Sequence, residues 1–134
     1  MKVDGGCHCG YISYETEIDP DSVFLCHCTD CQTLSGTAFR TVVPCPENSF
    51  ELLTGQLKTY IKTGESGAER PQVFCPECGT QIYSTSVGQG PRQFNLRVGT
   101  IRQRAELKPG AQYWFRSAQK WVMDLAGVRQ IAKG

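Results

Sequence analysis

Seven of the eight cysteines in this 134-residue sequence lie in three tight clusters, and cysteine thiolates are common ligands of zinc. The clusters are Cys7-His8-Cys9, Cys26-His27-Cys28-Thr29-Asp30-Cys31 and Cys75-Pro76-Glu77-Cys78-Gly79. In the third cluster, two thiolates two residues apart can reach one ion from a tight turn. Pro76 stiffens that turn, and Gly79 permits a positive φ just after the second ligand. This turn therefore predicts a zinc site that another pair of cysteines completes.

The seven clustered cysteines divide into four and three. Four thiolates close a structural zinc site, whereas three leave one position open, as a catalytic site requires. Spacing alone leaves two partners open for the third cluster: Cys28 with Cys31, or Cys7 with Cys9. We favour the second pairing, because the middle cluster places three ligands within six residues and can hold one ion mostly by itself.

The elements that must position these cysteines are predicted to be mainly β-strands. Short runs rich in β-branched and aromatic residues lie between turn signals that recur about every ten residues. The runs are Tyr11–Glu15, Ala38–Val43, Phe50–Leu53, Leu57–Thr63, Phe94–Val98 and Gln112–Phe115. One short helix is expected over Thr29–Ser35, with Thr29 or Asp30 as its N-cap and Gly36 at its end. The stretch 122–133 is ambiguous, with Gly127 in its middle.

Length and composition fit one small globular domain over residues 1–134, with 40% hydrophobic residues. No apolar run approaches the roughly 18 residues of a membrane helix. The first six residues have no apolar stretch of the kind found in a secretory signal. We therefore expect no membrane segment and a cytoplasmic protein, in which eight cysteines indicate metal or redox chemistry rather than disulfides.

The net charge of +1 is unevenly distributed along the chain. Residues 1–96 carry 6 Lys and Arg against 11 Asp and Glu, whereas residues 97–134 carry 8 against 2. The basic C-terminal third can hold an anionic ligand or pair with the acidic part of the chain. Because it has no basic run with interleaved aromatic residues, nucleic acid is not expected as a partner.

The cysteine motifs resemble those of the glutathione-dependent formaldehyde-activating enzyme family, which also includes centromere protein V. The matching segments are Gly6–Gly10, Cys26–Cys31 followed by Gly36, Phe74–Thr80, Leu96–Thr100 and Trp114–Ser117 with Trp121. The resemblance covers nearly the whole chain and implies a β-tent zinc fold of two packed antiparallel sheets with one short helix. It also implies a structural zinc on Cys7, Cys9, Cys75 and Cys78, and a catalytic zinc on Cys26, Cys28 and Cys31.

The activity that this resemblance implies is that of a carbon–sulfur lyase. A zinc ion with three thiolates takes another thiolate as its natural fourth ligand, and the thiolate is the nucleophilic form of a thiol. The partner would be glutathione or a similar thiol, added to or released from an aldehyde such as formaldehyde. Two alternatives are a zinc-stabilised module that binds nucleic acid or protein, and a protein for redox chemistry or metal buffering.

Several other residues are candidates for supporting roles around the three-cysteine site. Glutathione carries two carboxylates, so a cation near the site is expected; the candidates are Arg40, Arg97, Arg102 and Arg104. Asp30 is either a helix cap or a proton carrier close to the ligands. His27 and His8 are expected to pack or to support the ligands rather than bind metal.

Three further positions bear on the choice between an open and a closed site. Cys45 is expected to be a buried inert thiol, although as a fourth ligand beside the middle cluster it would close that site. Many family members have a His before the C-terminal aromatic pair, where this chain has Gln112-Tyr113-Trp114. The aromatic residues are expected to lie mainly in the core: Trp114, Phe115, Trp121, Phe39 and Phe94.

Overall fold

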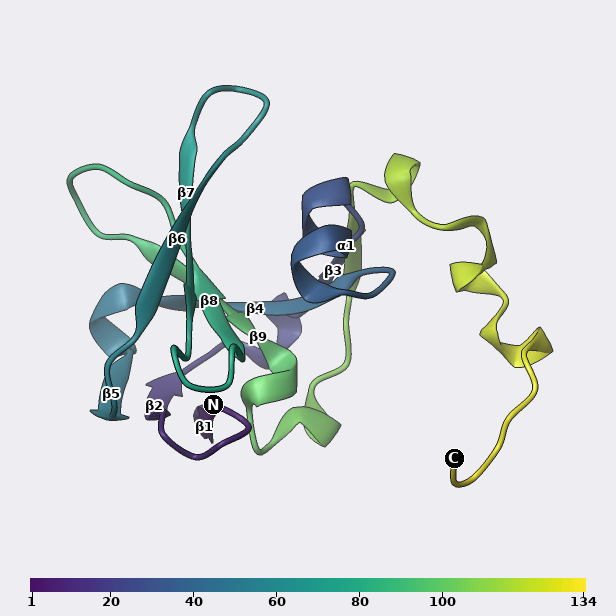
Figure 1. The fold of residues 1–134 in the computed structure, drawn as a ribbon, viewed down its shortest axis with the longest axis horizontal. Helices are drawn as coiled ribbons and strands as arrows, with labels where there is room; N and C mark the ends of the chain where they lie inside the picture. The colour runs from purple at the N-terminus through teal and green to yellow at the C-terminus, as the bar shows by residue number, and fades with distance from the viewer.

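Two β-sheets and one short α-helix form the fold, which a computed structural model describes over all residues 1–134 (Figure 1). The smaller sheet has the order β1-β2-β5 and is antiparallel. Its strands are β1 (Lys2–Gly6), β2 (Ser13–Glu17) and β5 (Glu51–Thr54). The predicted fold class, mainly β with two sheets and one short helix, is confirmed.

The larger sheet has seven strands in the order β10-β3-β4-β9-β8-β7-β6. They are β3 (Phe24–Cys26), β4 (Arg40–Pro46), β6 (Lys58–Thr63), β7 (Glu69–Phe74), β8 (Gln81–Ser84), β9 (Gln93–Arg97) and β10 (Ala111–Tyr113). All neighbouring pairs are antiparallel except β10 with β3, which run parallel. This edge pair departs from the expected antiparallel arrangement because the chain returns to β3 only after a long connection.

All six predicted runs overlap observed strands, with boundaries shifted by a few residues. Four strands were not predicted: β1, β3, β7 and β8. β1 ends in Gly5-Gly6, which no β-propensity would select. Gly5 is required there because a Cβ atom would lie 2.5 Å from the Tyr14 hydroxyl and 2.4 Å from a backbone oxygen. Close contact of β1 with its neighbour β2 and with the turn at Thr100 therefore overrides local preference at this position.

The core lies between the two sheets and is continuous with the first cysteine cluster. Buried side chains from both sheets meet there, including Val3, Tyr14 and Leu96. The Tyr14 hydroxyl lies 2.7 Å from Thr100 Oγ1, which satisfies a polar group inside an apolar layer. Cys75 belongs to the same core and is fully buried, so folding itself fixes this metal-ligand candidate.

The helix α1 (Thr29–Ser35) has the predicted bounds, and Gly36 ends it in the left-handed region at φ 69°. Its predicted N-cap is wrong. The cap residue is Cys28, whose Sγ accepts a hydrogen bond from the backbone N–H of Cys31 at 3.3 Å. A cysteine can take this place because its sulfur accepts hydrogen bonds, although Ser, Thr, Asp and Asn are the usual residues.

Beyond β10 the chain leaves the sheets and continues as short 3-10 turns over Phe115–Ser117, Lys120–Met123 and Leu125–Gly127. Figure 1 shows this segment, in yellow, running apart from the rest of the molecule. We refer to residues 118–134 as the C-terminal arm. Trp114, Phe115 and Trp121 are 47–53% exposed here, so their predicted core positions are wrong. The single α-helix has seven residues, and no helix meets the length and apolarity of a membrane span.

Candidate metal centres

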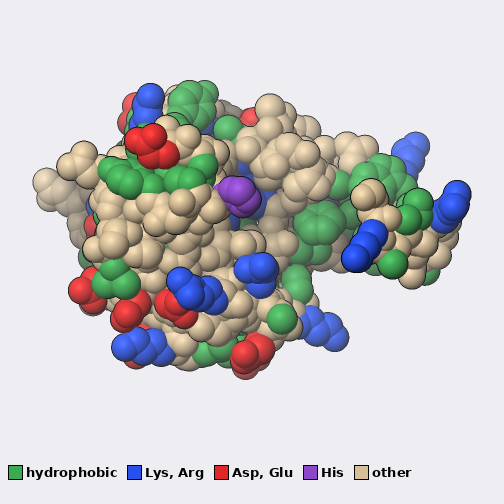
Figure 2. Space-filling view, turned by 60° about the horizontal axis from the view of Figure 1, so that its bottom comes forward, with side chains coloured by type: hydrophobic (Ala, Val, Ile, Leu, Met, Phe, Trp, Pro, Cys, Tyr) green, Lys and Arg blue, Asp and Glu red, His purple; other side chains and the backbone are tan.

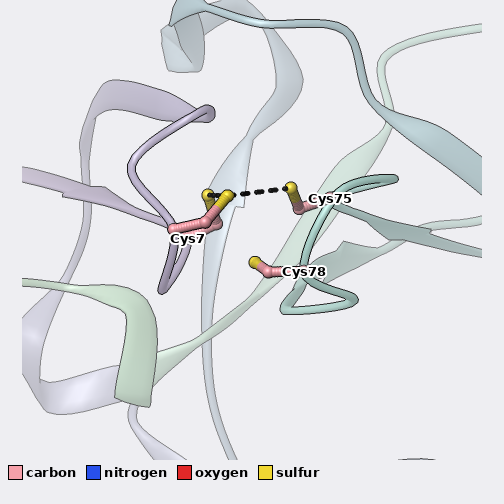
Figure 3. A group of neighbouring side chains, drawn as sticks. Cys7, Cys75 and Cys78 are labelled. Carbon is pink, nitrogen blue, oxygen red and sulfur yellow. Dashed lines mark hydrogen bonds between the residues drawn. The ribbon is translucent and has the colours of Figure 1, made fainter.

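Cys7, Cys9, Cys75 and Cys78 meet in one cluster, with all four sulfur atoms within 4.8 Å of one another. Two turns bring them together, one between β1 and β2 and the other between β7 and β8; Figure 3 shows Cys7 facing the Cys75–Cys78 turn. The backbone N–H of His8 donates to Thr80 Oγ1 at 3.1 Å and ties the turns to each other. This is the pairing favoured from sequence spacing.

The spacing of these sulfur atoms suits zinc. The Sγ atoms of Cys7 and Cys9 are 3.5 Å apart, and those of Cys9 and Cys75 are 3.9 Å apart. A tetrahedral site with Zn–S bonds of about 2.3 Å requires sulfur–sulfur distances of about 3.8 Å. Gly79, at φ 77°, lets the second turn fold back, and its N–H donates to the Cys75 carbonyl at 2.9 Å. Four sulfurs at these distances can surround one ion completely.

Hydrogen bonds prepare part of this cluster to hold negative charge. The Thr80 side chain, followed by backbone donors, lowers the pKa of Cys78 to about 5. The Ile12 N–H donates to Cys7 Sγ at 3.2 Å. Burial raises the pKa of Cys7, but this hydrogen bond and those of the Cys9 and Cys75 thiols outweigh burial and lower it. Thiolate is the form that binds a metal, so these donors favour ligation.

Cys26, Cys28 and Cys31 form the second cluster, again with all sulfurs within 4.8 Å. Cys26 ends β3, Cys28 caps α1, and Cys31 stands in the first turn of that helix. The contact between Cys26 and Cys31 lowers the pKa of Cys26, while the same contact and burial raise the pKa of Cys31. Cys26 is therefore the sulfur that ionises first, and Cys31 keeps its proton. Neighbouring thiolates repel each other, so both ionise only when a cation compensates their charge.

Cys45 lies outside both clusters and is fully buried in the core. Its hydrogen-bonding neighbours are Thr16 and Ser49, and burial raises the pKa of its thiol. Cys45 is thus the buried thiol predicted from sequence and not a fourth ligand beside Cys26, Cys28 and Cys31. The second cluster therefore contains three sulfur donors, one fewer than the first.

Two buried arginines lie beneath the three-cysteine cluster. Arg40 pairs with Cys26 across the β3–β4 ladder, and Arg97 lies on the neighbouring strand β9. Both are at least 93% buried and share one neutral acceptor, Gln72 Oε1, at 3.2 Å each. Three of their guanidinium nitrogens have no hydrogen-bond partner.

This arginine pair has no carboxylate against it, which is unusual for buried charge. Burial, then the like charge of Arg40, lowers the pKa of Arg97 to about 9. The charges of Cys31 and Cys26 act in the opposite direction. The thiolates of the three-cysteine cluster are therefore the anions that these two guanidinium groups face.

A cavity of about 410 Å³ opens beside Cys28, within the size range of small-ligand sites. We refer to it as the Cys28 cavity. Three cations line it together with two carboxylates, and Trp114 forms part of its wall. The charged residues are Lys62, Arg70, Arg116, Asp30 and Glu65. The cations come from the β6–β7 hairpin and from the segment after β10, which sequence proximity could not reveal.

Trp114 is the only non-glycine residue with a positive φ, at 55°. The Arg116 guanidinium lies 5.0 Å from the centre of its ring. The Trp114 side chain borders the Cys28 cavity and also a second cavity that contains Cys26. A bulky side chain in the left-handed region is strained, and such strain occurs at sites where geometry matters more than stability.

His27 is fully buried between the rings of Phe39 and Phe115. Its Nε2 donates to Gln112 Oε1 at 2.8 Å, so Gln112 faces His27. His27 therefore packs beside the ligand segment, as predicted. His8 is exposed and contributes through its backbone, so its expected packing role is wrong.

The structure shows which of the remaining polar candidates line the Cys28 cavity. Arg102 is ion-paired with Asp4 at 2.9 Å, and Arg104 donates to the Ile101 carbonyl; neither lines the Cys28 cavity. Asp30 is not the helix cap: its carboxylate pairs with Lys62 at 2.8 Å at the cavity wall. Sequence reasoning missed Lys62, Arg70 and Arg116; only Arg116 lies in the basic C-terminal third, and nothing in the sequence pointed to the other two.

Two comparisons bear on these centres. A sequence model of the family described as "Glutathione-dependent formaldehyde-activating enzyme" matches residues 2–117. A crystal structure of a Rhodobacter sphaeroides protein is similar with a TM-score of 0.62 and 17% sequence identity. The match covers 81% of this chain and 98% of that chain. At this identity the likeness concerns the fold alone.

Proposed function

Because the chain belongs to the glutathione-dependent formaldehyde-activating enzyme family, we propose that it binds a thiol at Cys26, Cys28 and Cys31 through a zinc ion. The observation that carries this proposal is the difference in donor number between the clusters, with the three-donor cluster beside a cavity. We assign a structural zinc to Cys7, Cys9, Cys75 and Cys78. A zinc ion held by three thiolates would keep the substrate thiol deprotonated near neutral pH.

The proposed reaction joins a thiol to an aldehyde. The thiolate sulfur attacks the carbonyl carbon, an S–C bond forms, and the carbonyl π electrons move to oxygen. The proton that left the thiol ends on this oxygen, so glutathione and formaldehyde give S-hydroxymethylglutathione. The reverse reaction breaks the C–S bond and is a carbon–sulfur lyase reaction.

The two buried arginines favour an anionic fourth ligand. Three thiolates around a divalent ion leave a net charge of −1, and a fourth thiolate makes it −2. The guanidinium groups of Arg40 and Arg97 supply the matching two positive charges from a buried position, where screening by water is weak. We propose that this balance makes a thiolate a better fourth ligand than a neutral water molecule.

The Cys28 cavity suits the ends of glutathione. Arg70 and Arg116 can each pair with a carboxylate, and Glu65 can pair with the ammonium group. The Asp30 carboxylate is already ion-paired with Lys62, so we assign neither of them a direct contact with the ligand. We propose that the cavity binds these charged ends while Trp114 borders the reacting thiol.

Titration of the cobalt-substituted protein with glutathione tests the proposal. Cobalt(II) reports its ligands through thiolate charge-transfer and d–d bands, so a thiol entering the site should add bands that saturate. Cys28→Ser should abolish the added bands, whereas Cys45→Ser, a change outside both clusters, should leave them unchanged. If the loaded wild-type protein shows no response to any thiol, the zinc-stabilised binding module becomes the better explanation.

The same proposal includes a cytoplasmic location. All eight cysteines are free thiols in this structure, and a reducing compartment keeps thiols in that state. A small thiol is the proposed partner, with no role assigned to nucleic acid. Fractionation of cells that produce the protein, with a cytoplasmic marker enzyme followed in parallel, would test this location.

A further inference from the structure

Two cavities reach the three-cysteine cluster, and the proposed function uses only one of them. Cys28 lines the Cys28 cavity, whereas Cys26 lines the second cavity, which has a volume of about 520 Å³. We refer to this second one as the Cys26 cavity. Trp114 belongs to the walls of both, and the Sγ atoms of Cys26 and Cys28 lie within 4.8 Å of each other. Two molecules, one in each cavity, can therefore meet at the same cluster.

The Cys26 cavity is built on one face of the large sheet. The neighbouring strands β10, β3, β4 and β9 all contribute residues to it. Phe24 and Cys26 are two residues apart on β3 and so lie on the same face, and Tyr113 pairs with Cys26 from β10. Pro44 and Asn95 pair with each other between β4 and β9. Because hydrogen-bonded strands hold these positions, the sheet fixes the shape of this wall.

The two cavities differ in charge. Five charged side chains line the Cys28 cavity, and three of them are basic. In the Cys26 cavity Asp21 is the single charged residue, and half of the lining residues are hydrophobic. Charged side chains of both signs are common elsewhere on the surface, as the face in Figure 2 shows. The Cys26 cavity therefore favours an uncharged ligand with an apolar group.

Aromatic rings form much of its apolar lining. Phe24 and Tyr113 contact each other edge to face, with ring centres 4.7 Å apart and planes at 79°. Trp114 adds a third ring, and both Tyr113 and Trp114 are about half exposed, so a ligand can reach them. The half-buried Asn95 offers an uncharged amide on the same wall. Such a lining suits a flat apolar group, because aromatic rings pack well against one another.

We propose that the Cys26 cavity binds the organic group of the second reactant, an uncharged aldehyde with an apolar or aromatic substituent. This inference rests on the proposed function, in which the Cys28 cavity holds the charged ends of glutathione. Formaldehyde has no such substituent, and its two heavy atoms, at roughly 30 Å³ each as for a water molecule, leave most of the cavity empty.

The larger aldehyde reacts in the same way as formaldehyde. The thiolate sulfur attacks the carbonyl carbon, an S–C bond forms, and the carbonyl π electrons move to oxygen, which takes the proton that left the thiol. The product is a hemithioacetal. Its substituent occupies the Cys26 cavity and its peptide part the Cys28 cavity, so both cavities contribute to specificity.

NMR titration with 2-phenylethanol, an unreactive analogue of phenylacetaldehyde, tests the cavity without any thiol. In ¹⁵N spectra of the zinc-loaded chain, the amides around Val23, Ala111 and Tyr113 should shift and saturate. Amides of the Cys28 cavity, such as that of Glu65, should not shift. Shifts centred on any other part of the molecule overturn the proposal, and so does the absence of shifts up to the solubility limit.

Two variants block the cavity from opposite walls. Ala111→Trp on β10 and Gln93→Trp on β9 change exposed lining residues, so the chain should still fold. Each should weaken 2-phenylethanol binding at least about fivefold, because the added ring fills the space of the ligand. Val87→Trp, at an exposed position outside the cavity, should leave the affinity unchanged. Wild-type affinity in both blocking variants overturns the proposal.

Exchange NMR links the cavity to the reaction by measuring how fast the chain equilibrates glutathione with each aldehyde. The ratio of the rate with phenylacetaldehyde to that with formaldehyde should fall at least about tenfold in Ala111→Trp, since only the larger aldehyde needs the cavity. An unchanged ratio overturns the proposal. Loss of 2-phenylethanol binding with intact cobalt–glutathione bands refutes the aldehyde assignment alone. Absent cobalt bands with 2-phenylethanol still bound refute the thiol proposal, and the aldehyde assignment with it.

Discussion

The two cysteine clusters use the same donor atom but differ in the number of donors and in their surroundings. The four-cysteine cluster joins two β-turns across the sheets and includes Cys75, a member of the hydrophobic core. The three-cysteine cluster is built within one short segment, at the end of β3 and the start of α1. A ligand set that connects distant segments stabilises the fold, whereas a local set can lose its ion and leave the fold in place.

Their electrostatic surroundings differ in the same sense. Neutral hydroxyl and backbone N–H groups, such as those of Thr80 and Ile12, serve the four-cysteine cluster. Two buried guanidinium groups and a cavity with three further cations surround the other cluster. Full positive charges favour an additional anion, while neutral donors only satisfy the ligands already present. The difference supports the roles proposed above, a structural zinc site in the first cluster and a reactive one in the second.

The largest expected effect is a difference in thermal stability between variants that lose a ligand from one cluster or from the other. Cys75→Ser should lower Tm by at least about 10 °C and reduce zinc to one ion per chain, because structural zinc contributes several kcal/mol to folding. Cys28→Ser should also leave one ion per chain but lower Tm by less than about 5 °C. Circular-dichroism melting with metal analysis measures both. Equal losses of Tm would remove the distinction between structural and reactive centres.

The buried arginine pair allows a sharper test. Arg97→Gln should retain two zinc ions and a folded chain, because removing a buried, partly unpaired charge is often tolerated. Thiol affinity should fall about tenfold or more, since one of two charges that balance the fourth thiolate is gone. Calorimetric titration with glutathione measures this loss.

The exposed Arg102→Gln variant is the control for Arg97→Gln. Arg102 pairs with Asp4 at the surface and does not line the Cys28 cavity, so its loss should leave thiol affinity unchanged. If both variants bind glutathione as wild type does, the buried pair has a structural role only.

The sequence predicted the clusters better than their surroundings, and the reason is physical. Ligand spacing within a turn is a local property, so Cys75 and Cys78 could be assigned to one turn without knowledge of the fold. The choice of Cys7 and Cys9 as their partners needed an argument from the remaining donors. The sheet packing then brought these four residues together as expected. The strand β7 was missed because it begins with Glu69, Arg70 and Pro71, a polar start without β-branched residues.

The residues that line the Cys28 cavity could not be predicted from the sequence, because their proximity depends on contacts between distant segments. Lys62 and Arg70 face each other across the β6–β7 hairpin and Arg116 follows β10, so only the folded chain brings these three cations beside Cys28. The exposure of Trp114 and Trp121 was also missed, because an aromatic residue in a small domain is normally buried. Trp114 borders the Cys28 cavity and Trp121 belongs to the C-terminal arm, so both lie outside the core.

A smaller effect is expected from the turn that closes the four-cysteine cluster. Gly79→Ala should reduce stability by about 1 kcal/mol, because φ at this residue is 77° and an L-residue is strained there. Gly99→Ala is a matched control with ordinary φ and open space around the added Cβ, and it should change Tm little. Zinc content should remain two per chain in both variants. Equal melting temperatures would show that the turn relaxes without loss.

The smallest effect concerns the cations that are exposed to water. Arg116→Gln should weaken glutathione binding about two- to fivefold, the range expected for the loss of an exposed ion pair of 0.2–1 kcal/mol. Binding of 2-mercaptoethanol, which has no carboxylate, should not change. Raising the salt concentration should reduce the difference between wild type and variant for glutathione alone, because screening acts on exposed charges. An equal loss for both thiols would instead place Arg116, through its contact with the Trp114 ring, among the residues that shape the thiol site.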